Sequence, residues 1–152
     1  MRKRIMVFTM LMIFLLSCFY GSAKDILPEE DKLVGVWLTT NVYDDEIEIY
    51  KEEGEYFGKA FVRPGKKVRL DVNNPDKSLR NRPLTNVIIL KSFKYKGKNR
   101  WGSGTVYDPD NGKTYSCNIT MKSNDKIKIR GFIGISLFGR TEKWTRVSTE
   151  TE

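Results

Sequence analysis

Residues 71–84 place several carboxylate, amide and guanidinium side chains within one short segment. Four of them carry side-chain oxygens that could ligate Ca²⁺: Asp71, Asn73, Asn74 and Asp76. Their spacing is not that of an EF-hand loop. Asx turns stiffened by the proline among them account for the same residue types. We therefore expect these four residues to have a structural role, and we expect no metal site.

Two arginines in the same segment could bind an anion. Arg80 and Arg82 could grip a carboxylate or phosphate bidentately, and together with Arg140 they could form a positive mouth for an anionic ligand. Alternatively, they bond to loop carbonyls or pair with nearby carboxylates, namely Asp71, Asp76 or Asp108. We favour this second interpretation, in which the arginines fasten the loop.

The chain contains no histidine, and this excludes histidine triads, histidine bases and zinc sites that need histidine. Cys117 shares strand parity with Ile119 and Met121, so we expect it to be an inert core residue without a base to activate it. We predict no catalytic residue and no cofactor. An enzyme that uses the Asp and Arg residues of 71–84 is the weakest of three functional hypotheses.

Aromatic residues offer a different kind of site. Trp101, Tyr107 and Tyr115, together with Trp37, could line a pocket for an apolar ligand. Ordinary core packing is the alternative, and the sequence does not separate the two in a small barrel.

These residues lie on or between short segments with the alternating polarity of β-strands. About eight such segments are joined mostly by tight turns: 33–40, 45–51, 56–63, 87–95, 100–107, 113–121, 126–130 and 140–147. No segment has sustained helical periodicity. Antiparallel strands in sequential order predict an all-β, up-and-down barrel, with a β-sandwich as the alternative.

The segment 131–139 is apolar and rich in glycine. It could be a lid, a tip that touches membranes, or a plug of the barrel. We expect a plug, because a long exposed apolar tip would promote aggregation.

The first 23 residues have the layout of a signal peptide. Three basic residues precede an apolar run at 5–16, and Gly21-Ser22-Ala23 follows. The run is shorter than the about 20 residues that span a membrane. We expect a single domain at 24–152 that is periplasmic or secreted. Alternatively, Leu15-Leu16-Ser17-Cys18 is a lipobox, and Cys18 anchors a lipoprotein.

Motifs on the first and last predicted strands point to a family. Gly35-x-Trp37 and Trp144-x-Arg146 resemble the pattern of lipocalins and their relatives, the calycins, in which an arginine of the last strand covers the tryptophan of the first. Nearly the whole mature chain also resembles an exported bacterial family known only as a domain of unknown function. The matching stretches include Gly35-x-Trp37, Asp71-x-Asn73-Asn74-Pro75-Asp76, Leu79-Arg80-x-Arg82-Pro83-Leu84, Trp101-x-x-Gly104-x-x-Tyr107-Asp108-Pro109, and Gly134-x-Ser136-Leu137-Phe138-Gly139-Arg140-Thr141 with Trp144-x-Arg146. The resemblance implies a lipocalin-like barrel and export, and it implies no particular activity. Asn86 stands where we expect a glycine.

The net charge of +8 includes the three basic residues of the leader, and we expect no nucleic-acid partner. Our first hypothesis is an envelope protein without enzymatic activity that binds a small apolar or amphipathic ligand in its barrel. The second is an interaction or structural protein with a filled barrel. We expect a monomer that contacts membranes only if Cys18 is lipidated.

Overall fold

A computed structural model describes residues 27–40 and 45–148, so the predicted signal peptide and Cys18 lie outside the described residues. The strands are β1 (Gly35–Leu38), β2 (Glu46–Glu52), β3 (Glu55–Phe61), β4 (Ile88–Tyr95), β5 (Arg100–Asp108), β6 (Lys113–Ser123), β7 (Lys126–Phe132) and β8 (Gly139–Arg146). Two short 3₁₀ helices, η2 (Glu29–Leu33) and η3 (Lys77–Leu79), complete the described structure. Among these residues, no helix has the length and apolar character needed to cross a membrane.

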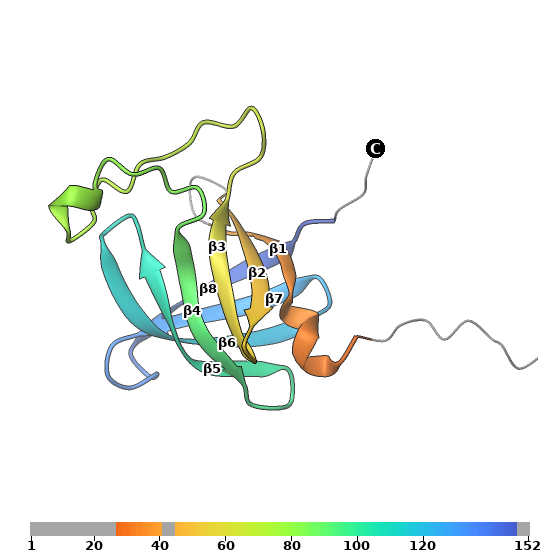
Figure 1. Ribbon diagram of the computed structural model, residues 1–152. Coiled ribbons are helices and arrows are strands. Elements are labelled where there is room, and N and C mark those ends of the chain that lie inside the picture. The colour runs from red at the N-terminus through yellow and green to blue at the C-terminus, as the bar shows by residue number, and fades with distance from the viewer. Residues whose placement is uncertain (1–26, 41–44, 149–152) are drawn as a thin grey trace, which may run out of the picture.

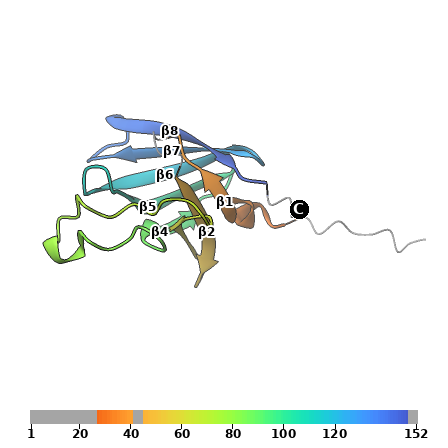
Figure 2. The ribbon, with the colours of Figure 1, turned by 90° about the horizontal axis from the view of Figure 1, so that it is seen from above.

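The strands form a closed antiparallel barrel in chain order (Figure 1). Strand β1 closes it by pairing with β8, with Trp37 opposite Arg146 and Leu38 opposite Thr145. Seen from above, β6, β7 and β8 lie on one side and β2 and β4 on the other (Figure 2). The predicted up-and-down, lipocalin-like barrel is confirmed, and the sandwich alternative is wrong because the sheet has no open edge between β1 and β8.

Alternate side chains of each strand point inward, as the pleat requires. The largest buried ones are aromatic: Trp37, Tyr56, Phe93 and Trp101 are at most 1% exposed. Aliphatic residues of β2, β4, β6 and β7 complete the cluster, among them Ile49, Leu90, Ile119 and Ile127. The period-two pattern in the sequence therefore marks the inner face correctly.

The two ends of the barrel differ in what covers them. We call the end formed by the β2–β3, β4–β5 and β6–β7 hairpins the closed end, and η2 lies across it. There Lys51 Nζ donates to Glu30 Oε1 at 2.7 Å, and the Tyr56 hydroxyl donates to Asp31 Oδ1 at 2.8 Å. The sequence gives no helical signal here, because η2 is too short for a helical period and is held by these contacts with β2 and β3.

A stacked pair of residues seals the closed end. The Arg146 guanidinium carbon lies 4.2 Å from the centre of the Trp37 ring. Its Nη1 donates to the Val34 carbonyl at 2.8 Å, and the Trp37 indole donates to the Leu33 carbonyl at 2.9 Å. Gly35 has φ +138°, and a β-carbon there would lie 2.3 Å from Arg146 Nη1. Only glycine leaves room for the guanidinium, which explains the Gly-x-Trp spacing physically.

The opposite end, which we call the open end, carries the long connection (residues 62–87), the β5–β6 turn (109–112) and the β7–β8 loop (133–138). These segments lie on the upper and left sides in Figure 1, away from η2. Within the long connection, Leu70 pairs with Pro83 as an isolated antiparallel bridge. Asn86 has φ 64° where the connection enters β4, a conformation that asparagine tolerates better than most residues, so it substitutes for the expected glycine.

Candidate ligand-binding cavity

A cavity of about 550 Å³ opens at the open end of the barrel. Its inner wall is apolar and comes from six strands and from the long connection. The residues are Ile47, Ala60, Leu84, Ile89, Val106, Ile129 and Trp144. Small side chains at positions such as Ala60 and Gly131 leave this volume unfilled, whereas bulky aromatics fill the closed half.

The rim of the cavity is polar. Arg69 bridges two carboxylates there, donating from Nη1 to Asp45 Oδ2 at 2.6 Å and from Nη2 to Asp110 Oδ1 at 2.5 Å. Lys67 and Arg140 also line the cavity, and the Arg140 side chain is 81% exposed. This rim joins the long connection to the β5–β6 turn across the mouth.

Glu142 brings a carboxylate into the wall itself. It stands opposite Ile129 on β7, so it points inward, and its Oε2 accepts a hydrogen bond from Trp144 Nε1 at 3.1 Å. Arg140 Nη2 lies 3.7 Å from Oε1. An acidic group thus lies between the apolar wall and a mouth that carries both basic and acidic side chains, among them Arg140 and Asp110.

Thr39 supplies a hydroxyl to the same wall. The residue is only 6% exposed, yet its Oγ1 has no hydrogen-bond partner among the described residues. Leaving a buried hydroxyl unpaired costs about 1–3 kcal/mol. A ligand with a polar group could form a hydrogen bond with this hydroxyl and so remove that cost.

Three of the six residues predicted to bind a ligand line the cavity, namely Tyr107, Tyr115 and Arg140. The Tyr115 hydroxyl accepts from Asn111 Nδ2 at 3.0 Å. Trp101 does not line it. That ring is fully buried near the closed end, where it packs against Tyr56 and Tyr95 with ring centres 6.2 and 5.2 Å away.

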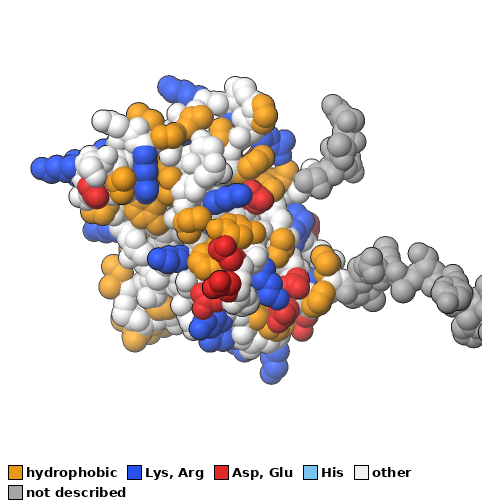
Figure 3. All heavy atoms as spheres, viewed as in Figure 1, with side chains coloured by type: hydrophobic (Ala, Val, Ile, Leu, Met, Phe, Trp, Pro, Cys, Tyr) orange, Lys and Arg blue, Asp and Glu red, His pale blue; other side chains and the backbone are white. Residues whose placement is uncertain are grey.

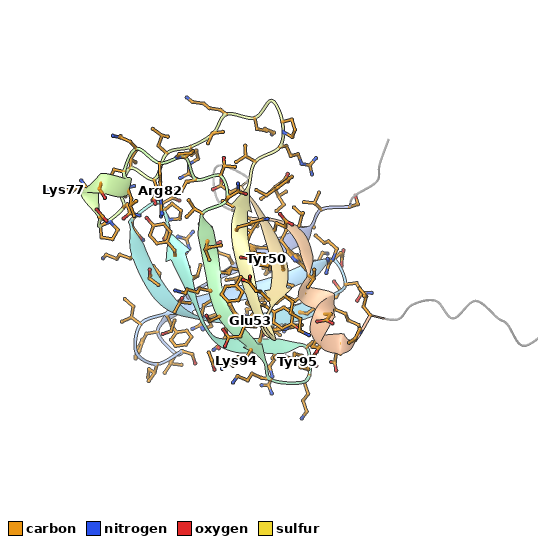
Figure 4. The ribbon with its side chains drawn as sticks, viewed as in Figure 1. Tyr50, Glu53, Lys77, Arg82, Lys94 and Tyr95 are labelled. Carbon is orange, nitrogen blue, oxygen red and sulfur yellow. The ribbon has the colours of Figure 1, made fainter. Side chains whose placement is uncertain are left out.

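Arg80 and Arg82 hold the long connection and do not line the cavity. Arg82 donates to Asp71 Oδ2 from Nε at 2.9 Å and from Nη2 at 2.7 Å. Arg80 Nε donates to the Asn74 carbonyl at 2.8 Å. In Figure 4 Arg82 lies on the part of the connection nearest the barrel, and Lys77 marks its far tip. The structure therefore does not bring these two arginines together with Arg140 in one anion site.

Asp71 is the centre of the long connection. Its carboxylate is fully buried and also accepts from the Tyr107 hydroxyl at 2.5 Å and from Asn74 Nδ2 at 2.7 Å. Burial raises the pKa of Asp71, but the hydrogen bonds from Tyr107, Asn74 and Arg82 outweigh it and leave the pKa below its usual value. The same burial and the facing carboxylate raise the pKa of Tyr107 to about 12.

The other oxygen-bearing residues of this segment bond locally. Asn73 Nδ2 donates to the Asp110 carbonyl at 2.9 Å, and Asp76 Oδ1 caps η3 by accepting from the Ser78 amide at 2.9 Å. A β-carbon on Gly112 would lie 1.9 Å from the Asn73 carbonyl oxygen, so this turn needs glycine. In residues 27–40 and 45–148, no three His, Cys, Asp or Glu side chains are grouped to hold a metal ion.

Cys117 is 1% exposed, and burial raises the pKa of its thiol to about 12. A thiol that stays protonated at neutral pH is a poor nucleophile. The structure places it in the core, as its strand parity indicates.

The expectation that residues 131–139 plug the barrel is wrong. Ile133, Ile135, Leu137 and Phe138, which we call the apolar tip, are 61–74% exposed. Only Ile133 and Phe138 border the cavity. Phe132 pairs with Gly139 at the end of the β7–β8 hairpin, and the loop between them leaves its apolar side chains exposed at the mouth.

Sequence reasoning missed Thr39 and Glu142. Both carry a usable signal, because Thr39 shares parity with the inward Trp37 and Glu142 shares parity with the inward Trp144. A polar residue at an inward-facing position of a small barrel does not contribute to the apolar core, so it is a candidate for contact with a ligand.

Comparison with known proteins agrees with the fold. Protein HP1028 of Helicobacter pylori, whose structure is described as belonging to the lipocalin family, is similar to this chain with 27% sequence identity and a TM-score of 0.70. The similarity covers 78% of this chain and 84% of that chain. No curated protein sequence matches.

A family model matches residues 35–146, and its description is "Uncharacterized protein conserved in bacteria" (DUF2147). The matched region starts at Gly35 and ends at Arg146, which are the two residues in close contact at the closed end. It spans all the barrel strands, the cavity, and the clamp, by which we mean Asp71 with its hydrogen-bond partners Arg82, Tyr107 and Asn74. The chain therefore belongs to the DUF2147 family of bacterial proteins, and its barrel is lipocalin-like.

Proposed function

We propose that this protein binds a small amphipathic ligand in the cavity at the open end of its barrel. The observation that carries the proposal is the cavity itself, which has about 550 Å³ of space, an apolar inner wall and a polar rim. Sites for small molecules have volumes of about 300–1,000 Å³ and combine apolar walls with a few polar groups. A barrel of eight strands has an interior that can hold one small ligand.

The wall indicates which part of a ligand lies where. An apolar body fits against Ile89, Ile129 and Trp144, and a polar group meets Thr39 or the rim. The Thr39 hydroxyl has no partner among the described residues, so a ligand that bonds to it compensates an existing cost. The mouth carries basic side chains such as Lys67 and acidic ones such as Asp110 and Glu142, so it suits a dipolar group.

A fluorescent apolar probe, N-phenyl-1-naphthylamine, tests the cavity directly. We expect its emission to rise on binding, and we expect Ala60→Trp to reduce the affinity strongly by filling the space. Phe57→Trp is the matched control, because Phe57 lies on the outer face of the same strand. Val62→Trp at the rim serves as a second cavity variant if Ala60→Trp unfolds the protein.

No binding by the folded wild type, or equal binding by both cavity variants and the control, would contradict the proposal. That result would favour an interaction protein whose loops bind another macromolecule. Native mass spectrometry of protein purified from its own host adds an independent measurement, because a retained small molecule would identify the ligand class.

Export is a separate part of the proposal and rests on the first 23 residues of the sequence. We propose a periplasmic or secreted protein, cleaved after Ala23. Mass spectrometry of the mature N-terminus distinguishes this from cleavage before a lipidated Cys18.

A further inference from the structure

The apolar tip is the largest exposed apolar feature near the cavity, and ligand binding alone does not explain it. Leu137 and Phe138 are 74% and 73% exposed, and Ile133 and Ile135 are 71% and 61% exposed. Clusters of large exposed apolar side chains mark interaction surfaces in soluble proteins.

The tip is held in its exposed position by hydrogen bonds. Arg130 on β7 donates from Nε to the Ser136 carbonyl at 2.7 Å and from Nη2 to the Leu137 carbonyl at 2.9 Å. Its Nη1 donates to Thr141 Oγ1 at 2.8 Å on β8. One guanidinium therefore connects both sides of the loop, and the loop presents its apolar side chains in a defined conformation.

The tip lies beside the mouth of the cavity. Its Ile133 and Phe138 line the cavity, and so does Phe61 at the end of β3. On the long connection Val68, Leu70 and Val72 are 40–57% exposed. Exposed apolar side chains therefore occur on both the long connection and the β7–β8 loop, two segments of the open end.

Basic side chains accompany these apolar ones. Lys66 and Lys67 are exposed on the long connection, and Lys67 lines the mouth together with Arg140, whereas Arg63 is paired with Glu46. In Figure 3 acidic and basic side chains mix over β2, β3 and β4, whereas basic ones predominate over the long connection. On the mixed face, ion pairs such as Lys59–Glu48 and Lys94–Glu55 balance the charges.

Apolar tips with neighbouring cations are the combination that binds the surface of an anionic bilayer. The apolar side chains enter the region between headgroups and acyl chains, and the cations attract the anionic headgroups. A lipid surface is also a source of amphipathic molecules, and the cavity mouth would face it directly.

We propose that the open end docks on an anionic lipid surface through the apolar tip, so that an amphipathic ligand passes between the bilayer and the cavity. The ligand transfer rests on the proposed function, whereas the docking does not. This peripheral contact uses side chains of the open end and needs no lipid attached to Cys18.

Co-sedimentation with vesicles of mixed phosphatidylcholine and phosphatidylglycerol tests the docking. We use the exported protein and compare wild type with Ile135→Ser/Leu137→Ser, two positions that do not line the cavity. We expect the variant to lose roughly tenfold in vesicle affinity, because two large apolar side chains no longer enter the bilayer. Leu27→Ser is the matched control, since Leu27 is 60% exposed and precedes η2.

The substitutions to serine leave the net charge unchanged. All variants also have the same N-terminus, so any vesicle affinity of the first residues is the same in every protein that is compared. We expect wild-type binding to weaken with added salt and on vesicles of phosphatidylcholine alone. In solution without vesicles, Ile135→Ser/Leu137→Ser should bind N-phenyl-1-naphthylamine as the wild type does.

Three outcomes would overturn the docking: no vesicle binding by the wild type, an equal loss in Leu27→Ser, or a wild-type dimer that the tip variant turns into a monomer. The last outcome would assign the tip to a second copy of the chain. Failure of the ligand proposal is seen separately, as a wild type that docks on vesicles but does not bind the probe.

Discussion

At each end of the barrel an arginine guanidinium contacts a buried side chain, but one end is filled and the other is hollow. At the closed end Arg146 stacks on Trp37 inside the barrel opening, and the end is filled. At the open end Arg82 and Tyr107 meet on Asp71 outside the barrel wall, and the interior beneath stays hollow. Arg146 and Arg82 each contact a buried side chain, but only Arg146 closes an end of the barrel.

The difference lies in side-chain size and in the position of the polar cluster. Bulky aromatic side chains occupy the closed half, whereas residues such as Ala60, Val106 and Gly131 line the open half. The long connection, held by the bonds to Asp71, lies beside the mouth and leaves the cavity open. Stability and ligand binding are thus separated along the barrel axis, and substitutions at the two ends should affect different measurements.

Removing the seal should have the largest effect. Trp37 is fully buried, so Trp37→Ala should lower the free energy of unfolding by about 4 kcal/mol, measured by chemical denaturation. The surviving folded protein should still bind N-phenyl-1-naphthylamine, because Trp37 does not line the cavity. Loss of probe binding by folded Trp37→Ala would show that the two ends are not separable.

Breaking the clamp on the long connection should cost less. Asp71→Asn keeps the shape of the side chain but removes the charge that Arg82 and Tyr107 bind, and we expect a loss of about 2 kcal/mol at neutral pH. Arg80→Ala is the control within the same segment, because it loses only a bond to a backbone carbonyl and should cost about 1 kcal/mol.

The effect of Asp71→Asn should depend on pH. The pKa of Asp71 lies below its ordinary value of 3.8 in the folded protein, so its carboxylate stabilises the fold above that pH. This contribution is lost as the pH falls through the lowered pKa. The difference in unfolding free energy between wild type and Asp71→Asn should therefore be constant above about pH 4 and shrink below it. A difference that is unchanged down to the acid transition would contradict the role of the charge.

A substitution in the cavity wall should have the smallest effect on stability, and it should raise the free energy of unfolding rather than lower it. Thr39→Val replaces a buried hydroxyl without a partner by a methyl group, so the empty protein should keep its stability or gain up to about 1 kcal/mol. A substantial loss in thermal or chemical denaturation would mean that the hydroxyl has a structural partner. A native ligand, once identified, should bind Thr39→Val more weakly than the wild type.

Much of the fold follows from local patterns in the sequence. Alternation marks Ile47 and Ile49 as inward, and the turn residues between strands set antiparallel neighbours. The Gly-x-Trp and Trp-x-Arg motifs locate the closed end because glycine, indole and guanidinium fit together in few ways. The pairing of Arg82 with a nearby carboxylate was predictable from charge, but the sequence left Asp71, Asp76 and Asp108 open as partners and did not indicate the bond from Tyr107.

The cavity was harder to foresee, because its volume depends on many side chains meeting across the barrel. Trp101 and Tyr115 look equivalent along the chain, yet one fills the closed half and the other borders empty space. The apolar tip was expected to plug the barrel because a long exposed apolar tip would promote aggregation. The loop between Phe132 and Gly139, held by the bonds of Arg130, leaves it exposed instead.

The amino-acid sequence was sufficient for the strand order, the inward faces and the family, since these depend on spacing along the chain and on short motifs. The hollow at the open end, the unpartnered hydroxyl of Thr39 and the exposure of the apolar tip arise from packing between residues far apart in the chain. Such packing is decided by three-dimensional volumes and hydrogen bonds, which a linear pattern does not contain.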